Sequence, residues 1–280
     1  MSGSDTTAAG GGFEGRGSLH RHLRLVAVQL RIRVLAALEY RSAFWTSGVL
    51  SLFWSVGGAI PLVVALEHRP DVAGWTPWSL AMLVGCHMLV NGLFGAVMVP
   101  ALFSAMEDIR TGALDYTLLR PVNALVSCLV ADFQPWSLVE SVVGVSLLVV
   151  AATAAHVSPG PLDAAMFVLV LGSGIAALYA LSVLILSLAF RALQLQNLAY
   201  VLESLLDFGR WPISVFRGPL RAVFTFVIPF AIMTSYPPMA LLGLLEPSAA
   251  VAAVGTAGGL GAVAGYAWRR ALAGYTSASS

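Results

Sequence analysis

The sequence predicts an all-α protein that crosses a membrane six times, and three observations point to this fold class. Apolar residues make up 58% of the 280 residues and charged residues only 10%, whereas a soluble domain carries about 25% charged residues. Several stretches of about 20 residues contain almost no charge, which is the length that an α-helix needs to cross a hydrocarbon core of about 30 Å. Arginines cluster before the first of these stretches and after the last, which indicates cytoplasmic termini.

The first 42 residues precede the membrane-spanning region. Residues 1–18 are rich in glycine, serine, threonine and alanine and lack the apolar core of a signal peptide, so we expect a disordered cytoplasmic tail. In residues 19–42, apolar side chains recur every three or four positions and arginines lie on another side: Leu23, Val26, Leu30, Val34 and Leu38 against Arg24, Arg31 and Arg41. This pattern predicts an amphipathic helix in the membrane interface. The alternative is a helix packed against a soluble partner.

Hydropathy identifies five spans. Because both termini are expected in the cytoplasm, the number of crossings must be even, so a sixth span is expected. The five are residues 43–66, 79–103, 136–155, 164–190 and 249–268. The remaining crossing, fifth along the chain, lies either at 192–213, which is polar, or at 222–245, which prolines interrupt. The six-span membrane domain therefore covers residues 43–270, and a cytoplasmic tail follows at 271–280.

Several chemistries are excluded by what the sequence lacks. All 15 basic residues are arginine, so the chain offers no lysine to the phosphates of a P-loop or to a Schiff base. There is no GxSxG or HExxH motif, and the two cysteines have no CxxC spacing, so no catalytic residue, metal site or other bound cofactor is expected. An intramembrane enzyme is the less favoured alternative, and no basic stretch suits nucleic acid.

Polar residues inside the apolar stretches are candidates for function, because a charge at the bilayer centre costs about 2.5–3.5 kcal/mol on insertion scales. His87 and Asn91 are four residues apart and share one helix face, and Glu140 lies one turn into the third span. A second polar face would combine Gln196, Tyr200, Glu203 and Asp207. These residues either line a polar pathway or form hydrogen bonds between helices within the bundle.

The last span contains two small-residue motifs, Gly255-x-x-x-Gly259 and Gly261-x-x-x-Gly265. Such spacing permits close approach of two helix backbones. In a chain rich in glycine and alanine the same spacing also arises by chance, so the motifs are a weak prediction of helix packing.

The segment 104–121, between the second and third spans, is amphipathic and expected in the cytoplasm. Its apolar side chains are Ile109, Leu114, Leu118 and Leu119, its charged ones include Glu107, Asp108, Arg110 and Arg120, and Pro121 can end a helix. A short helix of this kind can dock in a groove of a cytoplasmic protein. The alternative is a solvated loop.

The run GALDYTLLRP at 112–121 resembles the "GxLdxxLlRP" segment of the permeases of type-2 ATP-binding-cassette exporters. The runs LLDFGRWPIS at 205–214 and FVIPFA at 226–231, followed by Tyr236-Pro237, resemble a later segment of the same family. The resemblance extends in order over roughly residues 44–243. It implies a permease in the cytoplasmic membrane that pairs with a second, identical or different permease and with two ATPase subunits, which would bind ATP and Mg²⁺.

The resemblance also assigns roles to particular segments. It implies that residues 104–121 form a coupling helix, which contacts the ATPase through Glu107, Asp108, Arg110, Gly112, Leu114, Asp115, Leu118, Leu119, Arg120 and Pro121. It places the fifth span at 192–213 and a proline-broken re-entrant hairpin outside the cell at about 214–246, whereas the arginine count favours keeping Arg210, Arg217 and Arg221 in the cytoplasm. Besides the enzyme, the remaining alternative is a structural or assembly protein of the membrane.

Overall fold

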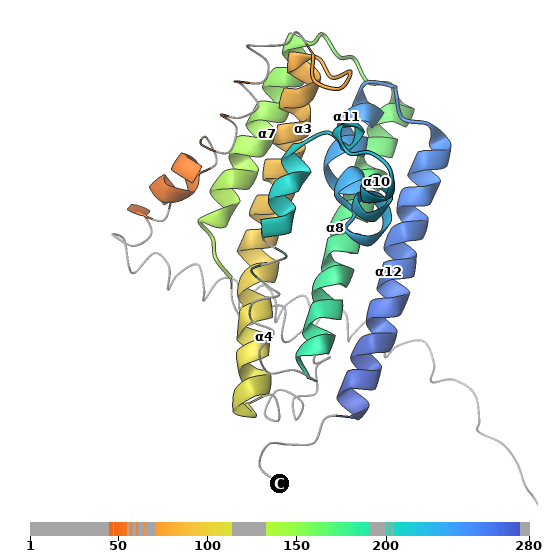
Figure 1. The fold of residues 1–280 in the computed structure, drawn as a ribbon. Helices are drawn as coiled ribbons and strands as arrows, with labels where there is room; N and C mark the ends of the chain where they lie inside the picture. The colour runs from red at the N-terminus through yellow and green to blue at the C-terminus, as the bar shows by residue number, and fades with distance from the viewer. Residues whose placement is uncertain are drawn as a thin grey trace, which may run out of the picture.

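The computed structural model describes residues 45–46, 48–54, 57, 60, 64, 71–113, 133–190, 200, 202 and 204–274 (Figure 1). The regular structure of these residues is helical, apart from an isolated antiparallel bridge between Val72 and Trp75. The all-α fold class is therefore confirmed for the part of the chain that is described. The expectations for residues 1–42, for 114–121, and for Gln196 and Glu203 lie outside the described residues.

Four helices of the described chain are long and apolar enough to cross a membrane. They are Pro77–Thr111, Ser137–Ala154 (α7), Pro161–Ala189 (α8) and Pro247–Ala273 (α12). A fifth candidate is a pair of helical segments, Pro219–Val227 and Ala231–Leu241, which are bent by 74° relative to each other. The six crossings expected from the sequence stay a prediction, because much of 43–66 and all of 191–199 lie outside the described residues.

The helix Pro77–Thr111 joins α3 (Pro77–Leu93), a π-helical turn η1 (Phe94–Met98) and α4 (Val99–Thr111). Its start follows local rules, since Pro77 occupies the first turn and the Thr76 hydroxyl accepts a hydrogen bond from the backbone N–H of Ser79. Its end is equally local, because Gly112 adopts a left-handed conformation with φ 77°. Residues 104–111, expected as the start of a separate short helix, thus continue the second span without a break.

The π-helical turn lies where Pro100 enters the helix. Proline has no N–H, so it cannot donate to the carbonyl of Ala96 one turn earlier. That carbonyl instead accepts a 2.9 Å hydrogen bond from the backbone N–H of Gln134, just before α7. The π-helical turn of one helix is therefore tied directly to the start of the next one.

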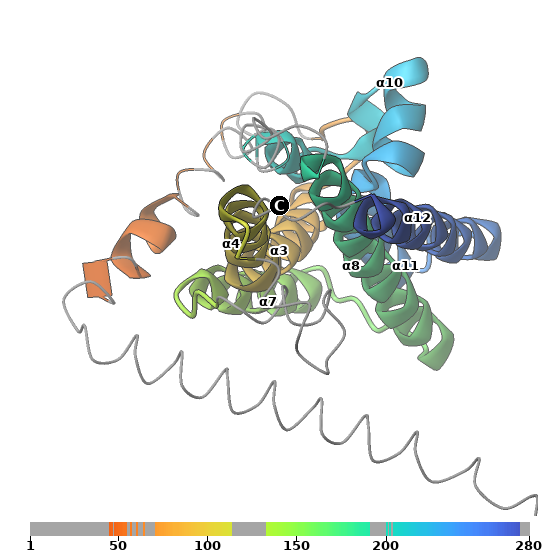
Figure 2. The ribbon, with the colours of Figure 1, turned by 90° about the horizontal axis from the view of Figure 1, so that it is seen from below.

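Helices α3 and α7 pack closely through residues without bulky side chains, and we call this contact the α3–α7 seam. A Cβ atom at Gly85 would lie 2.8 Å from the carbonyl oxygen of Gly144, and one at Gly144 would lie 2.6 Å from the carbonyl oxygen of Gly85. The Ser141 hydroxyl crosses the seam and donates to the carbonyl of Leu89 at 3.0 Å. Figure 2 shows the two helices side by side, with α8 and α12 on the other side of the bundle.

Helix α8 packs against α12 along its length through apolar side chains. Toward one end, Leu102, Ile109 and Leu186 pack with Trp268. Toward the other end, Val170 and Ile232 pack with Ala250 and Ala253. The side of α12 that carries its glycines is different, because a Cβ at any of them would meet no described atom within 4 Å: Gly255, Gly258, Gly259, Gly261 and Gly265.

Residues 204–246 form a folded insertion between these helices. It contains η2 (Asp207–Arg210), η3 (Ile213–Val215), α10 (Pro219–Ala222), η4 (Val223–Val227), η5 (Ala231–Ser235) and α11 (Tyr236–Leu241). An aromatic cluster around Phe224 includes Phe208, Phe216 and Phe230. The segment from α10 to α11 lies in the upper half of Figure 1, beside the N-terminal parts of α3, α8 and α12.

Candidate functional site

A polar cavity opens inside the bundle next to the α3–α7 seam. Its volume is about 610 Å³, and its polar lining comes chiefly from α3, α7 and η2: His87, Asn91, Glu140, Asp207 and Arg210. Residues of the predicted first span complete the wall, among them Phe53 and Trp54. A second cavity of about 370 Å³ shares Asn91, Glu140 and Asp207 with the first and adds Tyr200. The two cavities therefore meet at the same three polar side chains.

The cavity lies near the middle of the long helix Pro77–Thr111. At 1.5 Å per residue, Asn91 is about 21 Å along the helix from Pro77 and about 27 Å from Ile109. At this level Val90 and Phe94 pack with Leu178, which is in the central part of α8. The polar side chains are thus far from both ends of the bundle. Ionisable groups in the interior of a membrane protein are costly and indicate a function by default.

Asn91 and Glu140 connect the two helices of the seam. The Asn91 amide nitrogen lies 3.1 Å from each carboxylate oxygen of Glu140 and donates to them. This contact is a hydrogen bond between helices, as one of the two interpretations of the sequence expects. Both residues also line the cavity, and a role in a polar pathway stays a prediction.

Asp207 and Arg210 come from the short 3-10 helix η2. In a 3-10 helix, side chains three residues apart lie above each other, and the Arg210 Nη2 donates to Asp207 Oδ1 at 2.6 Å. The side chain of Asp207 is 65% exposed and that of Arg210 only 27%. Asp207 is one of the site residues expected from the sequence and Arg210 is not, although the spacing of three residues is a signal that such a pair can form.

His87 is the most deeply buried of the polar side chains at the cavity, with 4% of its surface exposed. Gly209 lies against its ring, because a Cβ at that position would be 3.2 Å from His87 Nδ1. Among the described residues, none forms a hydrogen bond with the imidazole. Because the ring lies at the wall of the cavity and has no such partner, its nitrogens can form hydrogen bonds with a ligand.

The structure brings together most of the polar residues that the sequence analysis placed on two separate faces. His87, Asn91, Glu140 and Asp207 line one cavity, and Tyr200 borders the neighbouring one, where its ring lies 5.0 Å from that of Phe103. The contributions of the first span, Ser51, Phe53, Trp54 and Gly57, were not expected. Their stretch is apolar and charge-free, so nothing in its pattern separates cavity-lining positions from lipid-facing ones.

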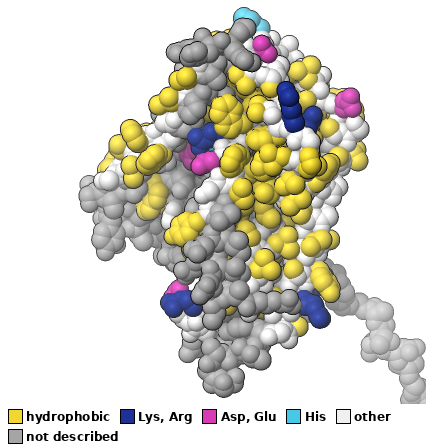
Figure 3. Space-filling model, in the orientation of Figure 1, with side chains coloured by type: hydrophobic (Ala, Val, Ile, Leu, Met, Phe, Trp, Pro, Cys, Tyr) yellow, Lys and Arg dark blue, Asp and Glu magenta, His cyan; other side chains and the backbone are white. Residues whose placement is uncertain are grey.

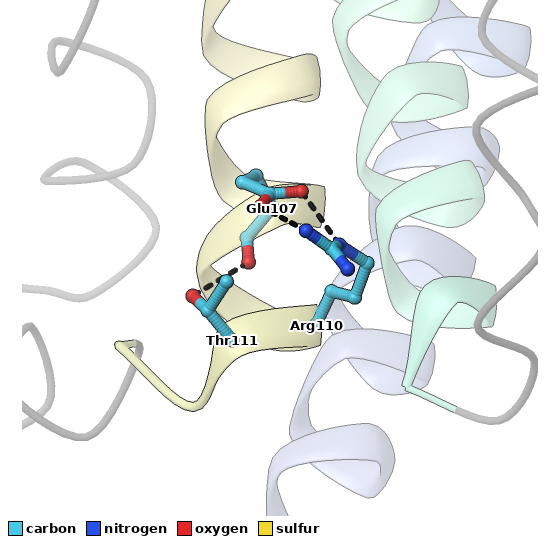
Figure 4. A network of polar contacts seen from close by, with 3 residues as sticks. All are labelled: Glu107, Arg110 and Thr111. Carbon is cyan, nitrogen blue, oxygen red and sulfur yellow. Dashed lines mark hydrogen bonds and ion pairs between the residues drawn. The ribbon is translucent and has the colours of Figure 1, made fainter.

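The described part of the segment 104–121 forms the lower end of α4. There Arg110 makes two hydrogen bonds to the carboxylate of Glu107, from Nε at 2.8 Å and from Nη2 at 2.5 Å, and the Thr111 hydroxyl donates to the Glu107 carbonyl (Figure 4). The pair is exposed, so it contributes little to stability. In Figure 3 charged side chains also appear at the lower end of the molecule, below a broad hydrophobic surface.

The comparisons with known proteins identify one relationship. A family model described as ABC-2 family transporter protein matches residues 52–279. The matched range includes every helix from α3 to α12 and all of the polar side chains from His87 to Arg210 that line the cavity. No curated protein and no solved structure matches the chain.

Proposed function

Because this chain belongs to the ABC-2 family of transporter proteins, we propose that it is the membrane subunit of an ATP-driven exporter. Two permease halves, identical or different, would form the translocation pathway in the cytoplasmic membrane and associate with two separate ATPase subunits. The absence of lysine supports the assignment of ATP hydrolysis to separate subunits, since a P-loop needs a lysine on the nucleotide phosphates. The members of this family are membrane components of transporters, so we propose a transport role for this chain and not an enzymatic one.

The observation that carries the proposal is the continuity of the helix Pro77–Thr111. His87 and Asn91 line the cavity near the middle of this helix, and Glu107 and Arg110 form its charged lower end. A helix of 35 residues is about 52 Å long at 1.5 Å per residue, so it extends well beyond a hydrocarbon core of about 30 Å. Movement of its lower end by a cytoplasmic ATPase would therefore reach the cavity through one continuous element.

The proposed orientation places the lower end of Figure 1 in the cytoplasm, with both termini on that side. Arg269 and Arg270 near the end of α12 and Arg110 on α4 support this orientation through the preference of arginine for the cytoplasmic side. The bent segment from α10 to α11 would then be the external re-entrant hairpin. Its packing against the N-terminal parts of α8 and α12, away from the lower end, supports that placement.

The first experiment asks whether the chain works with an ATPase. The tagged full-length chain is purified from its native membrane, bound proteins are identified by mass spectrometry, and the complex is reconstituted into vesicles. We expect an ATPase with a Walker A motif, ATP hydrolysis by the complex and none by the chain alone. ATP hydrolysis by the purified single chain, or the absence of any ATPase from the complex, would remove the proposal.

The second experiment tests the proposed coupling segment with Leu118→Asp. An exposed loop tolerates such a change within about 0.5 kcal/mol, whereas burying an unpaired carboxylate in a docking groove costs several kcal/mol. We therefore expect normal expression and membrane insertion but loss of ATPase docking and export, while the volume-conserving Leu118→Met keeps both. Glu107→Arg should have a milder effect that depends on salt. Normal docking and export by Leu118→Asp would show that the segment is only a loop.

A further inference from the structure

The charges at the polar cavity do not balance. Two carboxylates, Glu140 and Asp207, line it together with one guanidinium, Arg210. Arg210 is already engaged by Asp207 at 2.6 Å. Among the described residues, the hydrogen-bond partner of Glu140 is the neutral amide of Asn91. Among the described lining residues, carboxyl groups therefore outnumber guanidinium groups by one.

His87 provides a second and independent indication of a ligand. The imidazole is almost completely buried, borders the cavity and forms no hydrogen bond with any described residue. Buried polar groups in proteins nearly always have a partner. A neutral imidazole can accept one hydrogen bond and donate another, so a ligand N–H directed at the ring would satisfy its accepting nitrogen.

The rest of the lining is apolar and aromatic. Val84 and Met88 of α3 form one side, and Phe53 and Trp54 of the first span form another, with their rings 5.6 Å apart in an edge-on arrangement. Aromatic faces attract cations as well as apolar groups. A volume of about 610 Å³ lies within the range of about 300–1,000 Å³ typical of small-molecule sites.

We propose that this cavity binds an amphiphilic amine in its protonated form. The ammonium group donates hydrogen bonds to the Glu140 carboxylate and to the His87 imidazole, and the apolar body lies against Met88, Phe53 and Trp54. An anionic ligand is disfavoured, because it would meet the Glu140 carboxylate. This inference rests on the proposed function, of which it names the substrate class.

The test measures binding to the purified full-length chain in nanodiscs of zwitterionic lipid, with empty nanodiscs as the background. Three dansyl-labelled probes share one alkyl skeleton and end in a primary amine, an N-acetylated amine or a carboxylate. Because charge-assisted hydrogen bonds are stronger than neutral ones, we expect the amine to bind at least about tenfold more tightly than either analogue. Equal affinity for the three probes, or tighter binding of the carboxylate, would overturn the proposal.

Variants locate the selectivity. Glu140→Gln keeps the shape and can still bond to Asn91, and we expect it to abolish the preference for the amine. Glu246→Gln removes an exposed carboxylate at the start of α12, outside the cavity, and should leave the preference intact. Asp207→Asn changes a largely exposed side chain, so it tests the site even if Glu140→Gln fails to fold. Asp207→Asn should weaken amine binding and strengthen carboxylate binding. If the preference for the amine stays unchanged in Asp207→Asn and in a folded Glu140→Gln variant, the proposal is overturned.

The binding measurement needs no ATPase, so the two proposals can fail separately. A selective amine site in a chain that shows no ATP-driven export would leave the cavity assignment standing and remove the proposed function. ATP-driven export of the three probes without any preference, together with equal binding, would keep the exporter and remove the assignment of an amine substrate.

Discussion

In the α3–α7 seam, a Cβ atom added to Gly144 would lie 2.6 Å from the backbone of the facing helix, whereas one added to Gly259 of α12 would meet no described atom within 4 Å. The α12 glycines follow the spacing that predicts helix packing. On α3, the seam glycines are Gly85 and also Gly92, where a Cβ would lie 2.5 Å from the backbone nitrogen of Ser141, and they are seven residues apart. The four-residue glycine spacing thus predicts packing for α12, whose glycines have no neighbour in the described chain. What gives a glycine its role is the backbone opposite it, and this depends on the fold.

The seam also contains polar contacts between helices, and none of the described residues makes such a contact with the glycine side of α12. Asn91 bonds to Glu140 and Ser141 bonds to Leu89 across the seam, both next to the positions where glycine allows the backbones to approach. Close approach brings short polar side chains within hydrogen-bonding distance of the facing helix. The cavity therefore has a wall that is held together by close packing, and the comparison with α12 can be tested residue by residue.

The largest effect is expected for Gly144→Leu. The atoms that its side chain would overlap are backbone atoms of Gly85 and Leu89, which cannot move without separating α3 from α7. Overpacking typically costs 1–3 kcal/mol, and here we expect about 3 kcal/mol or more, measured by SDS unfolding of the purified chain. A variant as stable as the unmodified protein would show that the seam is not closely packed.

A smaller effect is expected for Asn91→Leu, which leaves the Glu140 carboxylate without the amide that donates to it. An unsatisfied buried group costs about 1–3 kcal/mol. A double-mutant cycle with Glu140→Leu isolates the pair, and we expect a coupling energy of about 1 kcal/mol, within the range known for hydrogen bonds between membrane helices. Strict additivity of the two changes would contradict a direct contact.

Ser141→Ala removes the hydrogen bond from the serine hydroxyl to the Leu89 carbonyl and leaves the backbone approach unchanged. Hydrogen bonds between membrane helices are worth about 0.6 kcal/mol on average. We therefore expect a loss of about this size in the same unfolding measurement. A loss as large as that of Gly144→Leu would mean that the hydroxyl, and not the packing, holds the seam together.

The smallest effect is expected for Gly259→Leu, the matched control for Gly144→Leu. The new side chain enters open space on α12, and leucine has a higher helix propensity than glycine by up to about 1 kcal/mol. Stability should therefore stay unchanged or rise slightly. A marked loss of stability or of assembly would show that this face of α12 is covered by another part of the chain or by a second molecule.

The two polar faces illustrate how far site prediction can go from a sequence. Spacing by four residues predicted that His87 and Asn91 share a helix face, and the cost of intramembrane charge drew attention to Glu140 and Asp207; all four line the cavity. Neither argument could place residues of different helices around one cavity. Asn91 and Glu140 are 49 positions apart, and their contact depends on how α3 and α7 pack. Arg210 was not among the expected site residues, although its spacing of three residues from Asp207 permits the contact between them.

The ends of the helices show a similar division. The second span was expected at 79–103, yet the helix runs from Pro77 to Thr111. Hydropathy ends where charge begins, but helical hydrogen bonding continues through Glu107 and Arg110 until Gly112 takes a left-handed conformation. Span length in lipid and helix length are thus different quantities, and only the first follows from hydropathy.

By itself the sequence determined that this protein is an all-α membrane protein of the ABC-2 family, because apolar length, scarcity of charge and short motifs are properties of contiguous residues. It also determined the approximate positions of α7, α8 and α12. Only the tertiary structure decided that glycines of α3 and α7, and not those of α12, meet a facing backbone. It alone also placed His87, Glu140 and Arg210 around one cavity. These relations are contacts between distant segments, which arise only when helices pack with a particular rotation and depth, and local residue patterns do not specify either.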